Sequence, residues 1–112
     1  MRKDNSVYIS HILDRAEKIL NWIEGMNEDS FFKDERTQSA IIREFEVIGE
    51  AAKRVSDDFK KSHSSIPWKL MSGMRDMLIH DYEGVNPKRV WDTAMNDIPV
   101  LIAEMKKILP SA

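Results

Sequence analysis

Apolar residues recur every three or four positions along most of this chain, the spacing that gathers them on one face of an α-helix. The first such run extends from Ile9 to Ile23, behind Asn5 or Ser6 as the helix N-cap and ahead of Gly25 as its stop. The second run is the most regular, with apolar residues at Ile41, Phe45, Ile48, Ala52, Val55 and Phe59. We therefore predict a helix from near Thr37 to Phe59 that packs along its whole length.

Two small residues lie within the second run. Gly49 and Ala51 lie in the middle of the predicted helix, where glycine is less favourable than alanine by about 1 kcal/mol. A second helix that approaches closely at this point would explain the glycine. Between the first two runs, Phe31 and Phe32 fall in a segment near residues 28–34 that we expect to form a short extra helix.

The second half of the chain predicts two more helices. A polar loop over residues 60–65 precedes Pro67, which suits the first turn of a helix over residues 67–82 capped by Ser64 or Ser65. Gly84 ends that helix. Asn86 and Pro87 then open a fourth run that continues to Leu109, and Pro99 inside this run should kink or split it.

These runs together define the expected fold class. The sequence has no strand pattern, internal repeat or low-complexity tract, and the predicted connections are short. We therefore expect an all-α fold, an antiparallel bundle of four main helices formed by one domain over residues 1–112.

The amino-acid composition excludes some classes of function but does not indicate a particular one. The chain has no cysteine, which excludes thiolate metal sites and fits a cytoplasmic protein. Its 17 basic and 19 acidic residues give a formal net charge of −2, so any nucleic acid must be attracted by a local patch. Residues 1–6 do not resemble a signal peptide, and no apolar run is long enough to span a membrane.

Candidate chemistry is concentrated at the end of the third predicted helix. With about 100° of rotation per residue, Arg75, Asp76, His80 and Tyr82 fall outside the apolar arc. That arc holds Leu70, Met71, Met74, Met77 and Leu78. Asp76 and His80 are four residues apart and can touch, so the carboxylate could orient the imidazole or raise its pKa. Surface helices also carry such residues without any chemical role, and the spacing alone does not separate the two interpretations.

Other candidate sites are weaker. His11, His63 and His80 have no metal-ligand spacing, and the chain has neither a glycine-rich phosphate loop nor a nucleophile elbow. We therefore expect no metal and no bound cofactor. The acidic side chains Glu44, Glu46 and Glu50 read as a solvated helix face, with pairs such as Glu50 with Arg54.

Several sequence blocks resemble a known family. The motif Arg75-x4-His80-x-Tyr82 follows Ile66-Pro67-Trp68-Lys69 and Gly73-Met74. Together with Ile48-Gly49-Glu50-Ala51-Ala52-Lys53-Arg54, Val90-Trp91-Asp92 and Asp97-Ile98-Pro99, it resembles the HepT-like toxins of the HEPN superfamily. The resemblance covers nearly the whole chain. Glu83 departs from the family pattern, which commonly has an aromatic residue there.

This resemblance implies a function. Its members are helical homodimers that cut RNA without a metal, which assigns Arg75 and His80 as catalytic and Asp76 as supporting. A minimal nucleotidyltransferase antitoxin transfers AMP to the tyrosine of the motif, here Tyr82. Two alternatives stay open: a non-catalytic binding subunit of a nucleotidyltransferase complex, or a helical dimerisation domain whose Arg75 and His80 only form surface pairs.

Overall fold

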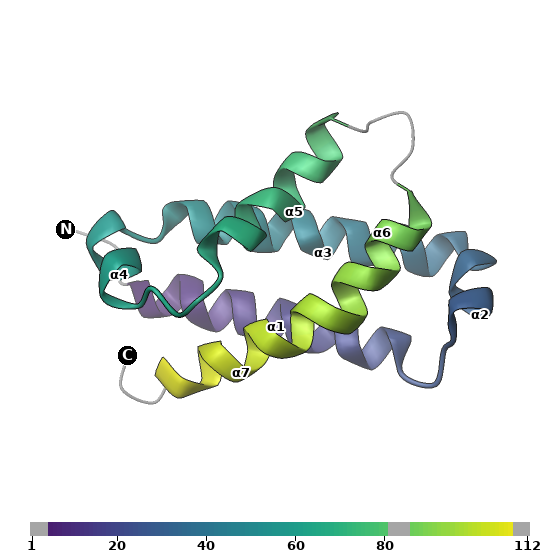
Figure 1. Cartoon of the computed structure of the whole chain (residues 1–112), viewed down its shortest axis with the longest axis horizontal. Helices are drawn as coiled ribbons and strands as arrows, with labels where there is room; N and C mark the ends of the chain where they lie inside the picture. Colours follow the sequence, from purple (N-terminus) through teal and green to yellow (C-terminus); the bar gives the residue numbers. More distant parts are fainter. Residues whose placement is uncertain (1–4, 81–85, 109–112) are drawn as a thin grey trace.

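The computed structural model describes residues 5–80 and 86–108, with side chains described except at 77–80, and over these ranges the fold is all-α (Figure 1). Its helices are α1 (Asn5–Ile23), α2 (Glu28–Phe32), α3 (Glu35–Arg54), α4 (Asp57–Ser62), α5 (Trp68–His80), α6 (Pro87–Asp92) and α7 (Ile98–Ile108), with a π-helical turn, η1 (Thr93–Asp97), between the last two. The chain runs back and forth along the long axis (Figure 1), so the expected antiparallel arrangement of four main helical segments is confirmed.

Backbone conformation and local hydrogen bonds explain where the early helices begin and end. Gly25 has a φ of +81° just after α1, in the left-handed region that glycine adopts without strain, so the predicted stop is confirmed. Asn27 and Ser30 form a reciprocal capping box at the start of α2, the predicted short helix. At α3, the Asp34 carboxylate accepts from the Thr37 backbone N–H at 3.0 Å, and hydrogen bonds from Thr37 lower the pKa of Asp34.

The second predicted helix is shorter than expected. α3 ends at Arg54, and Ser56 caps a separate helix, α4, by accepting from the backbone N–H of Phe59 at 3.2 Å. The prediction of one helix reaching Phe59 was therefore wrong, and so was a polar loop beginning at Lys60. Asn5 exchanges two hydrogen bonds of 3.1 Å with Ser56, one to its hydroxyl and one from its backbone N–H. This tie from α1 helps to fix the chain at the break.

The core lies where α1, α3, α5 and the last helical run meet. Its largest fully buried side chains include Ile9, Ile12, Ile19, Phe31, Ile41, Phe45, Ile48, Met71, Met74, Ile98, Leu101 and Met105. At its edge, Trp68 packs edge-to-face on Phe59 and donates its indole N–H to the His63 carbonyl at 3.0 Å. No helix in the described ranges has both the length and the apolar character that a bilayer crossing requires.

Pro99 has the local effect that its position predicts. A proline at this position cannot donate to the carbonyl four residues earlier, and η1 widens the helix just before it. α6 and α7 therefore form one continuous run interrupted by a π turn, as Figure 1 shows. Thr93, buried in this turn, donates its hydroxyl to the Arg89 carbonyl at 2.9 Å.

The π turn also contains an acid that burial disfavours. Desolvation raises the pKa of Asp97, and the nearby charge of Asp92 raises it further. Because the pKa of this carboxyl is raised in the folded state, its ionisation lowers the free energy of unfolding. The folded chain therefore gains stability as the pH falls through that pKa. We expect Asp97→Asn to raise the thermal midpoint by about 1–3 °C at pH 7, with the gain shrinking near pH 4. A lower midpoint than the parent at pH 7 would contradict this expectation.

Candidate active site

Three of the four candidate residues, Arg75, Asp76 and His80, lie on α5, which packs against α3. Met71 and Met74 of α5 are buried in the core, which confirms the apolar side of this helix for those two residues. The described helix begins at Trp68, one residue after Pro67, and runs to His80. In Figure 1 the far end of α5 projects from the bundle, away from α1 and α7. Arg75 and Asp76 therefore lie on a helix that packs against α3 and projects from the bundle at its far end.

Arg75 lies where α5 comes close to α3 at Gly49. A Cβ atom placed on Gly49 would stand 2.5 Å from the Arg75 Cβ, which is too close for real atoms, and 3.0 Å from the Met71 carbonyl oxygen, which is a tight contact. Because glycine has no side chain, the α3 backbone at Gly49 can contact the Arg75 side chain of α5. The prediction that Gly49 marks a close neighbouring helix is confirmed, and the neighbour is the helix that carries Arg75.

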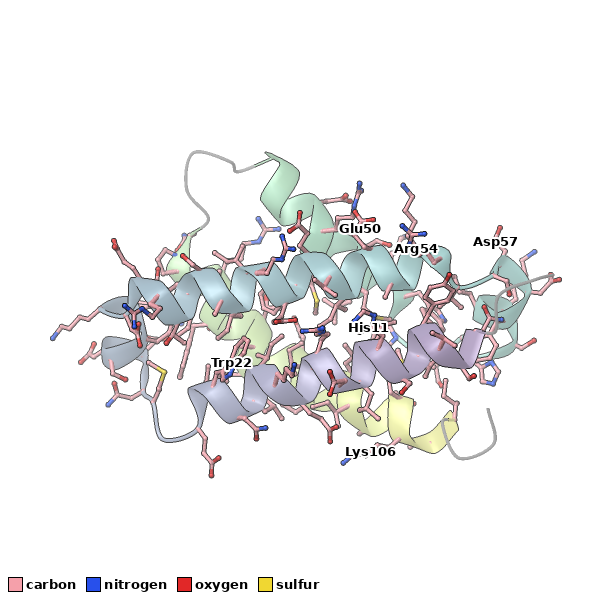
Figure 2. The ribbon with its side chains drawn as sticks, turned by 180° about the vertical axis from the view of Figure 1, so that it is seen from behind. His11, Trp22, Glu50, Arg54, Asp57 and Lys106 are labelled. Carbon is pink, nitrogen blue, oxygen red and sulfur yellow. The ribbon has the colours of Figure 1, made fainter. Side chains whose placement is uncertain are left out.

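Glu50, next to Gly49, forms an ion pair with Arg75. The Nε–H of Arg75 donates to the Glu50 Oε1 atom. This hydrogen bond lowers the pKa of the Glu50 carboxyl and, with the charge of Glu50, raises the pKa of Arg75. The sequence prediction that Glu50 would pair with Arg54 was wrong, because the carboxylate turns toward α5 instead. Figure 2 shows Glu50 on α3 at the point where α5 rises behind it, with Arg54 one turn further along.

The outer end of Arg75 is accessible. Its side chain is 31% exposed, and within the described part of the chain its two terminal nitrogens have no hydrogen-bond partner. Since these nitrogens carry four of the five guanidinium N–H groups, Arg75 can bind an anion while it remains paired with Glu50. Arg75 is therefore attached to α3 on one side and open to solvent on the other, rather than fully solvent-facing as its place on the helix suggested.

The other motif residues are described less fully. Asp76 is exposed next to Arg75, and its charge contributes to the raised pKa of Arg75. His80 belongs to the helix, but its side chain lies outside the described residues, as does the whole of Tyr82. The predicted contact between Asp76 and His80 and the placement of Tyr82 stay predictions. Among the described residues, no cluster of three or more His, Cys, Asp or Glu side chains could hold a metal ion.

Comparison with known proteins gives the family. The family model described as Ribonuclease HepT-like matches residues 9–108. The chain belongs to this family. It is 41% identical over 91% of both chains to a Caldanaerobacter subterraneus subsp. tengcongensis protein provisionally named an RNase. It is 39% identical to the probable ribonuclease HepT of Thermococcus cleftensis, over 96% of this chain and 98% of that one. No solved structure gave a significant match.

Membership confirms the resemblance that the motif and the flanking blocks indicated, and with it a ribonuclease-type protein. A third relative, from Methanocaldococcus jannaschii and also provisionally named an RNase, is 40% identical over 96% of this chain and 89% of its own length. Such coverage means that these relatives match the HepT-like chain nearly from end to end.

The predicted solvated acidic face of this HepT-like chain is confirmed for Glu46, which is 47% exposed, and is wrong for Glu44. Glu44 is buried, with 6% of its surface exposed, and its Oε1 atom lies 3.4 Å from the Nη1 atom of Arg15 on α1. It therefore belongs to the contact between α1 and α3 rather than to a solvated face. Glu50 is 43% exposed, and only its predicted partner was wrong. The family-like block and the adjacent Gly49 drew attention to this position, but neither identified Arg75 as the residue that Glu50 meets.

Proposed function

We propose that this protein is a metal-independent endoribonuclease toxin that cuts RNA with Arg75 and His80 in a cleft shared by two copies of the chain. The observation that carries this proposal is Arg75 itself, held on α3 through Nε while its terminal nitrogens stay available for a phosphate. Membership of the ribonuclease HepT-like family supports the assignment of RNA as the substrate.

The chemistry requires three functions at one phosphodiester. A base removes the proton from the 2′-hydroxyl, whose oxygen attacks phosphorus; a cation stabilises the phosphorane; and an acid protonates the departing 5′-oxygen. The products are a 2′,3′-cyclic phosphate and a free 5′-hydroxyl. A histidine such as His80 can serve as base or acid near neutral pH, and Arg75 stays charged throughout.

Homodimer formation would complete this set. Each protomer has one Arg75 and one His80, whereas the reaction needs both a base and an acid. A two-fold axis beside the projecting end of α5 would bring two copies of each residue to one cleft. Exposed Asp76 would then act as a supporting group for His80.

Tyr82 is the proposed point of control. A cognate minimal nucleotidyltransferase would act as antitoxin by transferring AMP from ATP to the Tyr82 hydroxyl, with release of pyrophosphate. Because Tyr82 follows His80 by two residues, the added phosphate and nucleoside would lie at the mouth of the cleft. The adduct would exclude RNA sterically and compete for Arg75.

The activity is tested with purified protein and a 5′-labelled RNA in buffer containing EDTA. We expect cleavage products that end in a 2′,3′-cyclic phosphate, and their absence from a His80→Ala preparation made in parallel. Equal cleavage by the two preparations would identify a contaminating nuclease and refute the proposed activity.

The control step is tested by mass. Expression with the neighbouring nucleotidyltransferase gene should add the mass of one or more AMP units to the chain and abolish its toxicity. We expect Tyr82→Phe to stay unmodified and toxic in the presence of that partner. Modification that maps to another residue would show that Tyr82 is not the target.

A second function is favoured by the charge of the chain. Its formal net charge of −2 gives no general attraction for RNA, which suits a non-catalytic helical binding or dimerisation subunit of a nucleotidyltransferase complex. Such a subunit would co-purify with that partner and leave RNA intact at every protein concentration.

A further inference from the structure

We propose that Gly49 and Glu50 of α3 form a seat that positions the Arg75 guanidinium, which makes Glu50 a positioning residue for the reaction. This inference rests on the proposed function, in which Arg75 binds the scissile phosphate. Glu50 itself touches no reacting atom. It acts through Arg75, from a different helix and at a sequence distance of 25 residues.

The first part of the argument is which nitrogen Glu50 uses. It accepts from Nε, at the inner edge of the planar guanidinium, and leaves both terminal nitrogens without a partner in the described part of the chain. A carboxylate on the terminal nitrogens would instead compete directly with a phosphate. The pair thus fixes the plane of the guanidinium and keeps its outer fork available for two phosphate oxygens.

The second part is how the base of the side chain is held. The ideal Cβ position on Gly49 lies 2.5 Å from the Arg75 Cβ and 3.3 Å from its Cα, so no other residue type allows this approach without a shift. Arg75 is therefore held at its base by helix packing and near its head by Glu50. Restricting a long side chain before substrate binds lowers the entropy that must be lost in the transition state.

Charge supports the same arrangement. The hydrogen bond from Arg75 lowers the pKa of Glu50, and the charges of Lys53 and Arg54 lower it further, so the carboxylate stays ionised well below neutral pH. These two basic residues on α3 also offset the negative charge that Glu50 brings near an RNA phosphate. The seat can therefore hold Arg75 without making the surroundings strongly repulsive for the substrate.

α3 offers a matched control one turn earlier. Glu46 is 47% exposed, close to the 43% of Glu50, and its partner Arg43 lies on the same helix at 3.4 Å. Both glutamates lie on α3, are similarly exposed and each pair with an arginine, but only Glu50 has its partner on α5. The charge of Glu46 also acts on Arg75, more weakly than that of Glu50 and without a hydrogen bond. A groove between α1 and α3 also borders Glu50, so its outer side is open and substitution there should leave the fold intact.

The kinetic test compares Glu50→Ala, Glu50→Gln and Glu46→Ala with the parent on an RNA oligonucleotide. We expect Glu50→Ala to lower kcat about 10- to 100-fold with KM changed less than about threefold. Gln should recover much of that loss, because its amide oxygen can accept from Nε, while Glu46→Ala should behave as the parent. Unchanged or increased kcat in Glu50→Ala, or an equal loss in Glu46→Ala, would overturn the proposal.

A second measurement does not depend on RNA cleavage. The Nε–H resonance of Arg75, assigned by its loss in Arg75→Lys, should exchange slowly with water in the parent and in Glu46→Ala, and rapidly in Glu50→Ala. Rapid exchange in the parent would overturn the seat, whatever the activity. Slow exchange in a parent that cleaves no RNA would support the seat and refute the proposed ribonuclease function.

Discussion

Under the proposed function, Arg75→Ala is expected to abolish RNA cleavage and toxicity, with a fall in kcat of about 100- to 1,000-fold, because the variant removes the cation that we propose stabilises the phosphorane. Arg75→Lys should restore little of this activity. Lysine keeps the charge but lacks both the Nε–H that Glu50 binds and the planar fork that holds two phosphate oxygens. The measurement is single-turnover cleavage of a labelled RNA in EDTA, together with growth of cells that express each variant.

The matched control for this loss is Arg43→Ala. Arg43 belongs to α3 and is 73% exposed, and its ion pair in the described part of the chain is with Glu46 of its own helix, so its removal should leave cleavage and growth inhibition at the parental level. Thermal unfolding of both variants should lie close to that of the parent, because the pairs are partly solvated. Full activity in a folded Arg75→Ala protein would refute the catalytic assignment.

Gly49→Ala and Gly73→Ala are expected to change stability in opposite directions although the chemical change is the same. A methyl group on Gly49 collides with the Arg75 Cβ and makes a tight contact with the Met71 carbonyl oxygen. Overpacking of this kind costs about 1–3 kcal/mol, which should exceed the gain in helix propensity. At Gly73 on α5 the added methyl meets nothing within 4 Å, so that variant should be more stable by about 0.5–1 kcal/mol.

Chemical denaturation of the two variants measures this difference directly, and we expect it to be about 2 kcal/mol. Gly49→Ala should also lose cleavage activity, because relief of the collision moves α5 and the base of Arg75 away from Glu50. Stabilisation of the chain by Gly49→Ala would show that α3 and α5 separate easily at this point, and the close approach would then not hold Arg75 in place.

The helices were largely predictable because a single repeat, apolar residues at every third or fourth position, governs both the local conformation and the buried face. The break between α3 and α4 was missed because Val55 and Phe59 continue that repeat across it. What interrupts the helix is the side chain of Ser56, which caps α4 and pairs with Asn5. A contact between residues 51 positions apart leaves no periodic signal in the sequence.

The candidate site was predictable to a different extent. The motif pointed to Arg75, and the glycine at position 49 pointed to a close helix, but nothing local linked the two. Spacing along one helix favours Glu50 with Arg54, four residues apart. The structure pairs Glu50 across helices because the close approach at Gly49 brings the Arg75 side chain within reach. Tertiary packing therefore determines which of two arginines, Arg54 or Arg75, pairs with Glu50.

The π turn before Pro99 changes which neighbours the last helical run can reach. It adds about one residue to a helical circuit and so rotates everything after it by about 100° relative to an uninterrupted α-helix. α6 accordingly packs against α2 and α3, whereas α7 packs against α1. Deleting one residue within the turn would bring the two halves back into phase, and the run could then satisfy one set of neighbours only by giving up the other.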